Sequence, residues 1–480
     1  MTRKTVKGKR KFACKAEREE TETGTGNVCA VTTEPRGPCC KQHQPSDPDL
    51  IRRDLLSWYD VNKRDLPWRK VSSHDINQRA YAVWVSEIML QQTQVATVID
   101  YYNKWMKRWP TLQHLAKATL EEVNEMWAGL GYYSRGRRLH EGAKKVVEEL
   151  GGEMPSTAET LLKQLPGVGK YTAGAIASIA FNEVTGLVDG NVVRVFARLF
   201  IIGGDSTSQM VTDTLWSLAN TLVDLDQPGN FNQALMELGA TVCNPKTPSC
   251  SKCPLKSHCK AYSQVIDWQK RTASRLTESK ASKGKDADFP DIENASLDCK
   301  LCLPSSEPWD SSLGVTNYPR KSKKKAPREE QTPVCIVQNC KDEYLIVQRP
   351  KTGLLAGLWE FPSATPLGVE CDQTEAVRHL QQHLHSKLHI GGKDKNNLAY
   401  VGEVKHLFSH ISQTYVVYQL TQVDSVLGEL GGQCGDQCAR WVDRDQLMEA
   451  AISTAMKKVF KTYEASLSKQ SDGEKNCKVR

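Results

Sequence analysis

The sequence predicts a multidomain protein, with an all-helical domain over residues 47–262 followed by an α+β domain over residues 329–465. Its 480 residues exceed what one hydrophobic core usually organises. In the first part of the chain, apolar residues recur at the spacing of amphipathic helices. In the second part, short alternating runs, at 332–338 and 344–348, are typical of strands.

Composition points to an anionic partner and away from a membrane. The net charge is +8, and basic runs at Lys4–Lys11 and Lys321–Lys325 suit nucleic acid, although both could be solvated tails or localisation signals. No apolar stretch is long enough to span a bilayer, and we expect no secretory signal. Sixteen cysteines in such a chain favour metal binding in a reducing compartment over disulfides.

Residues 1–46 are rich in Lys, Glu, Thr and Gly and poor in large apolar side chains, so we expect a disordered basic arm. Its Lys-Gly-Lys-Arg-Lys run at 7–11 could act as a nuclear address. We therefore expect residence in the nucleus, and the mitochondrion stays open as an additional location.

The helical domain begins with a helix pattern at 51–59 and a proline-interrupted segment that carries Arg64, Trp68 and Arg69. Two guanidiniums around an indole suit phosphate contacts and base stacking. A capped loop with a buried tryptophan explains the same residues equally well.

A helix pattern at 81–100 places Glu87 in an otherwise apolar turn. Burial would keep this carboxyl protonated near neutral pH, as a general acid requires. The alternative is a buried structural glutamate paired with an arginine. Gln91, Gln92 and Thr93 follow at once and could present hydrogen-bonding groups to a base or to the gap that it leaves.

Residues 129–138 combine glycines, paired tyrosines and three arginines within one turn and helix start. Leu130 and Tyr132, beside glycines and close to cations, fit a wedge that enters a base stack and is flanked by phosphate contacts. An ordinary charged helix start would look similar.

The stretch from 165 to 191 organises the domain. It opens with Leu-Pro-Gly-Val-Gly, a turn whose amides at Gly167, Gly169 and Lys170 can point at a phosphate, helped by the N-terminus of the next helix. Asp189, in Val-Asp-Gly-Asn-Val, then places a carboxylate just before another helix. Taken alone, the glycines could merely make a turn between helices.

Four cysteines at the end of this domain have the spacing of a metal site, Cys-x6-Cys-x2-Cys-x5-Cys, in short loops that contain prolines. They are Cys243, Cys250, Cys253 and Cys259. Four thiolates in so compact a span can hold an iron–sulfur cluster or a zinc ion, and the spacing does not choose between them.

The hairpin, the aspartate after it and the cysteine loop together resemble the endonuclease III superfamily of helix-hairpin-helix DNA glycosylases, whose loop holds a 4Fe-4S cluster. Within it, Ser-Glu-x-Met-Leu-Gln-Gln-Thr from 86, Gly-Leu-Gly-Tyr-Tyr-Ser-Arg from 129 and Val-Asp-Gly-Asn-Val from 188 resemble the adenine DNA glycosylases, the MutY family. The likeness covers roughly residues 50–262. It implies base excision repair of adenine mispaired with 8-oxoguanine or guanine in double-stranded DNA.

The resemblance implies a role for each site residue. Glu87 would protonate the departing adenine, and Asp189 would stabilise or trap the oxocarbenium-like sugar. Tyr171 and Asn191 would hydrogen-bond this pair. The side chains expected to line the adenine pocket or flank the gap left by the flipped base are Trp68, Arg69, Gln92, Leu130 and Tyr132.

One position separates two subclasses of the superfamily. Bifunctional members carry a Schiff-base lysine directly after Leu-Pro-Gly-Val-Gly-x, where this chain has Tyr171. Lys170 stands one residue earlier and should face elsewhere on a helix. We therefore expect a glycosylase without efficient strand cleavage. The alternatives are a bifunctional lyase acting on oxidised pyrimidines and a non-catalytic mismatch-binding protein.

Residues 263–328 shift in composition to Ser, Lys, Asp and Pro and predict a partly disordered linker. The pair Cys299-x2-Cys302 could supply two zinc ligands, but the third linker cysteine of vertebrate relatives is missing between 262 and 298. The linker could instead dock repair or checkpoint proteins.

The α+β domain has strand patterns at 332–338, 344–348, 400–403 and 414–419, and helix patterns at 374–385 and 445–459. This order resembles the Nudix, or MutT-like, fold. The magnesium-binding box of Nudix hydrolases is absent from the sequence, and the first helix carries only Glu375 as an acid. We therefore expect a domain that binds without hydrolysing.

Phe408-Ser409-His410 stands in a loop between strands of this domain. In adenine glycosylases such a loop recognises 8-oxoguanine, with Phe able to intercalate and with donors and acceptors on Ser and His. Taken alone, it could be ordinary loop chemistry. The tail at 466–480 is polar, is expected to be disordered, and lacks the Gln and paired Phe of a sliding-clamp peptide. We expect a monomer.

Overall fold

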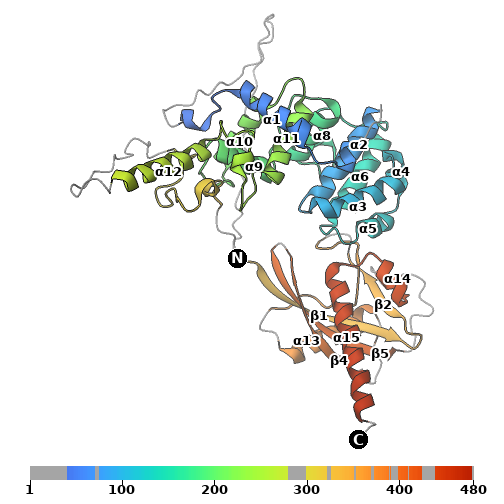
Figure 1. Ribbon diagram of the computed structural model, residues 1–480. Coiled ribbons are helices and arrows are strands. Elements are labelled where there is room, and N and C mark those ends of the chain that lie inside the picture. The colour runs from blue at the N-terminus through green and yellow to red at the C-terminus, as the bar shows by residue number, and fades with distance from the viewer. Residues whose placement is uncertain are drawn as a thin grey trace, which may run out of the picture.

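A computed structural model describes residues 40–70, 75–278, 299–321, 326–350, 353–368, 372–388, 390, 398–408, 410–423 and 438–477. The predicted disordered arm falls almost entirely outside this range, and so does Ser409. The chain forms a helical body and a smaller body built on a sheet (Figure 1). None of the described helices combines the length and the apolar character needed to cross a membrane.

The helical domain contains α1 (Pro48–Asn62), α2 (Ile76–Leu90), α3 (Val95–Arg108), α4 (Leu112–Lys117), α5 (Leu120–Trp127), α6 (Ser134–Glu149), α7 (Ala158–Gln164), α8 (Lys170–Phe181), α9 (Gly190–Leu199), α10 (Gln209–Leu222) and α11 (Pro228–Thr241). Short 3-10 helices are η1 (Cys40–His43), η2 (Pro67–Arg69) and η3 (Cys250–Lys252). Local sequence sets several helix starts. Asp47 caps α1, and Thr119 and Thr157 form capping boxes at α5 and α7.

Two hydrophobic clusters fill the helical domain. The first includes the fully buried Trp84, Trp105 and Trp127, and the second is built mainly from α1, α9, α10 and α11. Helix α8 is apolar on nearly all sides and contributes to both clusters. It packs against α2, which is also buried almost throughout. The N-terminal turn of α8 therefore stands at a fixed place between the two clusters.

The linker predicted from composition is partly built into the helical domain. Helix α12 (Lys260–Glu278) begins directly after the last cysteine of the loop, so a boundary at 262 falls inside a helix. Within residues 299–321, which include η4 (Gly314–Asn317), Val315 and Tyr318 are buried in the second cluster. The prediction missed this because few apolar residues are enough to dock a short segment on an existing surface.

The C-terminal domain contains β1 (Arg328–Asn339), β2 (Tyr344–Gln348), β3 (Trp359–Glu360), β4 (Ala399–Leu407), β5 (Ile411–Val423) and β6 (Ala439–Val442), with helices α13 (Gln373–Leu388), α14 (Arg444–Glu449) and α15 (Thr454–Cys477). The strand order is β3-β2-β1-β5-β4, with β6 also on β2. Strands β1 and β5 are parallel, and the other pairs are antiparallel. Alternate residues of β1 face opposite sides, so Val334 packs with α15 and Cys335 with α13.

Two expectations for this domain need correction, and two of its strands were not predicted. The helix predicted at 445–459 is two helices, because the chain turns after α14 and Ser453 caps the start of α15, its Oγ accepting from the Met456 amide at 3.2 Å. Helix α15 also runs to Cys477, across most of the tail predicted to be disordered. The short strands β3 and β6 gave no recognisable pattern.

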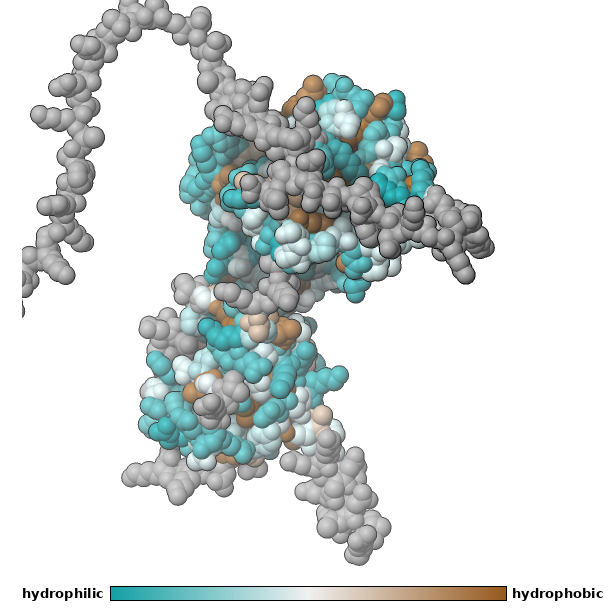
Figure 2. All heavy atoms as spheres, turned by 90° about the vertical axis from the view of Figure 1, so that its left-hand side faces the viewer, coloured by the Kyte–Doolittle hydropathy of each residue, from teal (hydrophilic) through white to brown (hydrophobic). Residues whose placement is uncertain are grey.

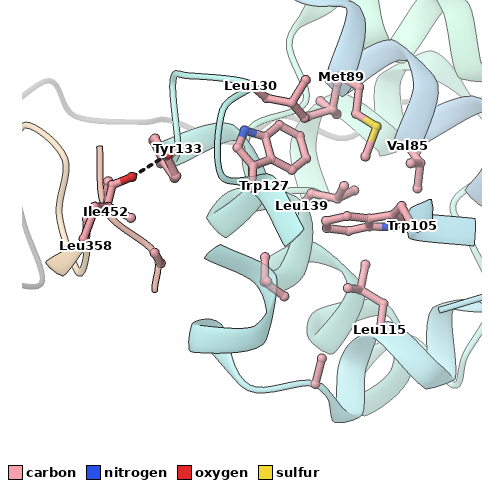
Figure 3. Close-up of a cluster of buried hydrophobic side chains, with 14 of the residues drawn as sticks. Val85, Met89, Trp105, Leu115, Trp127, Leu130, Tyr133, Leu139, Leu358 and Ile452 are labelled. Atoms are coloured by element: carbon pink, nitrogen blue, oxygen red, sulfur yellow. Dashed lines mark hydrogen bonds between the residues drawn. The ribbon is translucent and has the colours of Figure 1, made fainter. Parts of the chain in front are cut away.

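The first hydrophobic cluster continues from the helical domain into the C-terminal domain. In Figure 3, Tyr133 points away from Trp127 toward Leu358 and Ile452, and its hydroxyl donates a hydrogen bond to the Ile452 carbonyl at 3.5 Å. Glu121 adds a polar contact across the same junction, since its Oε1 lies 3.2 Å from Trp359 Nε1. The space-filling view shows the two bodies as separate lobes, and most of the residues coloured on this face are hydrophilic (Figure 2).

Candidate active site

One cavity of about 420 Å³ gathers most of the residues singled out in the helical domain. Its lining comes from η2, α2, α8, α11 and the start of α9. The four predicted catalytic residues, Glu87, Tyr171, Asp189 and Asn191, all line it. So do five of the predicted DNA contacts, Arg64, Trp68, Arg69, Gln92 and Thr93. Its size suits a planar heterocycle such as a nucleobase.

Glu87 and Tyr171 form a hydrogen-bonded pair in this cavity. Glu87 is 5% exposed on α2, and the Tyr171 hydroxyl, on the first turn of α8, donates to its Oε2 at 2.5 Å. Burial raises the pKa of Glu87 to about 7; the Tyr171 hydrogen bond acts to lower it, and the nearby Asp189 carboxylate to raise it. This carboxyl can therefore hold a proton near neutral pH. Burial also raises the pKa of the Tyr171 phenol well above its ordinary value.

Asp189 is held very differently from Glu87. It caps α9, and its Oδ1 accepts hydrogen bonds from the amides of Asn191 at 2.9 Å and Val192 at 2.7 Å. The Asn191 side-chain amide donates to the other oxygen at 2.7 Å. Burial raises the pKa of Asp189, but all three hydrogen bonds oppose it because they favour the charged form. The two carboxyls thus stand in contrasting environments: one phenol donates to Glu87, whereas three N–H groups donate to Asp189 and favour its charged form.

Glu237 holds both predicted arginines in place and was missed from the sequence. It is 1% exposed on α11, and it accepts from Arg64 Nε at 2.6 Å and from Arg69 Nη2 at 2.8 Å. Burial acts to raise the pKa of Glu237, but the two guanidiniums hold it below its ordinary value. Arg69 also donates to Gln233 at 3.2 Å. Nothing local in the sequence joins α11 to residues about 170 positions earlier.

The glycine hairpin has the geometry that the sequence predicts. Gly167 lies at φ +77°, and a Cβ there would come within 2.8 Å of Arg138 Cβ. Gly169 is the N-cap of α8. The ammonium of Lys170 lies 4.0 Å from the centroid of the Trp216 ring, away from Tyr171 and its cavity. Phosphate contacts at this hairpin stay a prediction.

The predicted wedge is corrected at one of its two residues. Leu130 is 6% exposed and packs into the core beside Met89 and Trp127 (Figure 3), whereas Tyr132 is 50% exposed. The chain reverses at Gly129 and Gly131, both at positive φ, and this turns the leucine inward. Tyr132 is therefore the side chain that this loop presents.

A second cavity, of about 370 Å³, lies between the two domains. Tyr132 lines it from the helical domain, and Phe408 and His410 line it from the predicted lesion loop between β4 and β5. The Phe408 ring meets the edge of the His406 ring, with centroids 4.6 Å apart. The structure thus brings Tyr132 of the wedge loop to the same cavity as Phe408 and His410, which are far from it in the sequence.

The four cysteines of the loop line a third, apolar cavity together with Arg198. Arg198 Nη1 donates to the Cys243 sulfur at 3.3 Å. Burial raises the pKa of Cys253 to about 11 and that of Cys259 to about 12, so these thiols need a cation to become thiolates. Four sulfurs around one apolar space fit a thiolate-bound metal centre. Arg194 ties the loop to the catalytic turn, donating to the Cys243 carbonyl and to Asn191 Oδ1, each at 2.7 Å.

Cys299 and Cys302 have a third potential ligand that the sequence did not reveal. His43 Nε2 lies 3.7 Å from the Cys299 sulfur and 3.5 Å from the Cys302 sulfur. Its Nδ1 lies 2.9 Å from the Phe200 carbonyl, so the hydrogen sits on Nδ1 and the Nε2 lone pair faces the thiols. His43 precedes the cysteines by about 256 residues, a separation that spacing rules do not cover.

Two family models match the chain: HhH-GPD superfamily base excision DNA repair protein at residues 85–221, and NUDIX domain at residues 333–462. Adenine DNA glycosylase from the rat (Rattus norvegicus) is 54% identical over 428 residues, which cover 87% of this chain and 79% of the relative. This chain belongs to the adenine DNA glycosylase family. The human (Homo sapiens) member is 52% identical over 437 residues, covering 89% of this chain and 77% of its own.

Among solved structures, a thermostable thymine-DNA glycosylase is 30% identical and aligns 98% of its chain with 47% of this one, at a TM-score of 0.40. The family matches confirm the fold class predicted from the sequence, a helix-hairpin-helix domain followed by a Nudix-like domain.

Proposed function

We propose that this protein is a monofunctional adenine DNA glycosylase that hydrolyses the glycosidic bond of adenine mispaired with 8-oxoguanine or guanine in double-stranded DNA. The observation that carries the proposal is the protonatable Glu87, paired with Tyr171, in the same cavity as the capped carboxylate of Asp189. Family membership supports adenine as the base, since the relatives are named for it.

The two carboxyls divide the work of the reaction. Glu87 gives its proton to a ring nitrogen of the flipped adenine, so the base leaves neutral rather than as a poor anionic leaving group. Asp189 stays ionised and stabilises the positive charge that develops on the sugar, or bonds to it until water arrives. Water supplies the hydroxyl that ends on the sugar, and its proton returns to Glu87. Tyr171 and Asn191 fix the positions of the two carboxyls.

The cavity also supports base removal without strand cleavage. None of the described residues lining it is a lysine; its cationic side chains are the guanidiniums of Arg64 and Arg69. A guanidinium stays protonated and does not form a Schiff base with the abasic sugar. Tyr171 occupies the position of the lysine that bifunctional relatives use, and its phenol is held protonated.

We propose that the interdomain cavity recognises the base opposite the adenine. Tyr132 would enter the stack while Phe408 and His410 contact 8-oxoguanine, together with Ser409, which lies outside the described residues. The Nudix-like domain would act by binding alone, since α13 carries Glu375 as its one acid.

Two metal centres complete the proposal. Cys243, Cys250, Cys253 and Cys259 would hold a 4Fe-4S cluster, which fixes the loop between α11 and α12 when bound. His43, Cys299 and Cys302 would hold a zinc ion that pins the linker to the helical domain, with a fourth ligand from outside this trio. Zinc content measured on the purified protein and on Cys302→Ser tests the second site, and equal zinc in both would reject it.

Repair or checkpoint proteins are the proposed protein partners of the linker region. The helix α12 and the segment after it expose Trp268 and Leu313, and Trp268 lies beside Trp309 with ring centroids 6.4 Å apart. Exposed aromatic side chains of this kind are typical anchors for a partner. We further propose a nuclear location and a monomeric state.

Single-turnover excision on a panel of duplexes tests the proposed function. The panel holds adenine opposite 8-oxoguanine, adenine opposite guanine, thymine opposite guanine, and an oxidised pyrimidine opposite guanine. We expect excision of adenine alone, and we expect Asp189→Asn to abolish it while mismatch binding persists. Excision of the oxidised pyrimidine would support a lyase of the endonuclease III type. Binding without any excision would support a mismatch-binding protein.

A further inference from the structure

We propose that Arg135 is a positioning residue that couples the adenine cavity to the interdomain cavity, and so makes excision respond to the base opposite the adenine. The inference rests on the proposed function and goes beyond it, because it assigns the discrimination between 8-oxoguanine and guanine partly to a residue that need not touch DNA. From the sequence, this arginine belongs to the residues expected to contact phosphate. The structure places it 9% exposed, at the second residue of α6.

One side of the guanidinium holds the segment that lines the adenine cavity. Nη1 donates to consecutive carbonyls at the end of α2, those of Ile88 at 2.9 Å and Met89 at 3.1 Å, and to that of Gln91. Nη2 donates to Thr93 Oγ1 at 3.2 Å. These acceptors bracket Gln92, whose neighbours Gln91 and Thr93 line the adenine cavity with it.

The other side holds the loop that presents Tyr132. Nη2 also donates to the carbonyls of Leu130 at 3.2 Å and Gly131 at 3.0 Å. The guanidinium carbon lies 5.4 Å from the centroid of the Trp127 ring and 5.5 Å from that of the Tyr132 ring. A single planar group therefore bonds both loops, and each loop lines a different cavity.

Backbone conformation shows what these bonds maintain. Gln92 lies at φ +58° and Tyr132 at φ +48°, the left-handed region that side chains other than glycine avoid. Such conformations persist only where the surroundings enforce them. Gln92 lies between two residues that accept hydrogen bonds from Arg135, and Tyr132 directly follows another. The arginine is therefore placed to fix the direction of both side chains at once.

The contacts also show why an arginine is needed. Within the described residues, the guanidinium contacts carbonyls, one hydroxyl and two aromatic rings, and there is no carboxylate among these groups. A charge buried without a counter-ion is costly, so its value lies in the number of acceptors that it joins. A lysine offers three donors on one atom and cannot reach both loops with the same planar fork.

The test compares single-turnover rates on adenine opposite 8-oxoguanine and adenine opposite guanine, in the wild-type protein and in Arg135→Lys. We expect the ratio of the two rates to contract by about tenfold in the variant, the size of coupling typical of residues in contact. The matched control is Arg79→Lys. Arg79 is a partly buried arginine whose Nη2 donates to the Ala180 carbonyl at 2.7 Å, and it lines neither cavity. The control should keep the wild-type ratio.

An unchanged ratio in Arg135→Lys would overturn the inference, whether both rates fall equally, which marks a purely structural bond, or neither rate changes. If the wild-type protein excises neither adenine, the proposed function itself fails, which is a separate result. If the variant does not fold, hydrogen exchange on the wild-type protein tests the coupling instead. The amides of 92–93 and 130–132 should gain protection together on binding the 8-oxoguanine duplex, and independent protection of the two loops would contradict the coupling.

Discussion

The hydrogen bond from Tyr171 to Glu87 makes a quantitative prediction about the pH dependence of excision. Glu87 must be protonated to act as the acid, so the single-turnover rate should fall as pH rises through about 7, the pKa of its buried carboxyl. Tyr171→Phe keeps the aromatic ring but removes the hydroxyl that stabilises the Glu87 carboxylate. Without this donor the pKa of Glu87 rises further, and the alkaline limb of the rate profile moves to higher pH.

The size of the shift follows from the bond that is lost. The Tyr171 hydroxyl donates to Glu87 Oε2 at 2.5 Å in a buried site. A hydrogen bond to a charged group contributes about 1.5–3 kcal/mol, and about 1.4 kcal/mol corresponds to one pKa unit. The alkaline limb of Tyr171→Phe should therefore lie about one to two pH units above that of the wild type.

The shift is measured by single-turnover excision from a duplex with adenine opposite 8-oxoguanine, at about ten pH values from about 5.5 to about 9.5. Enzyme in excess over DNA at every pH removes the contribution of product release. A limb that stays in place in Tyr171→Phe, or that moves to lower pH, would refute the assignment of Glu87 as the acid. A lower plateau rate with the expected limb would leave the assignment intact.

Three further predictions concern stability and metal content. Glu87→Gln should raise the free energy of unfolding at pH 8 by about 3 kcal/mol, because the pKa of Glu87 is about 7 in the folded protein and 4.5 ordinarily. The cost of the ionised carboxylate grows as pH rises between these two values. Below pH 4.5, urea unfolding should give the same free energy for the variant and the wild type. Glu237→Gln should lower the free energy of unfolding, measured in urea, by about 3 kcal/mol, since two guanidiniums lose their buried carboxylate partner. The control is Asp60→Asn, which breaks an exposed ion pair and should change the same free energy by under about 0.5 kcal/mol. Cys253→Ser should lower the iron content and the melting temperature, and the exposed Cys438→Ser should change neither.

Residues whose neighbours are close in sequence could be predicted well. Asp189 and Asn191 stand on one turn, so their motif already contains their hydrogen bonds. The four cysteines lie within a short loop, and their spacing alone indicated a shared site. Glu87 stood out because a carboxyl in an apolar helix has few explanations, and its environment is the one that the pattern implied.

The rest depended on contacts between distant segments. His43 meets Cys299 across about 256 residues, and Glu237 meets Arg64 across 173. Leu130 was misjudged because the sequence gives the composition of its loop but not the direction of its side chain, which the turn at Gly129 and Gly131 decides. The role inferred for Arg135 likewise depends on two loops that only the fold brings together.

We propose base removal without strand cleavage, at a cavity where Tyr171 stands in the position of the Schiff-base lysine. A single-turnover reaction of a duplex with one adenine opposite 8-oxoguanine, divided afterwards into samples with and without alkali, separates these two activities. We expect strand breaks only in the alkali-treated sample, because the strand that carries the abasic site remains intact until alkali cleaves it. Breaks without alkali would contradict the account, and so would an absence of breaks in both samples.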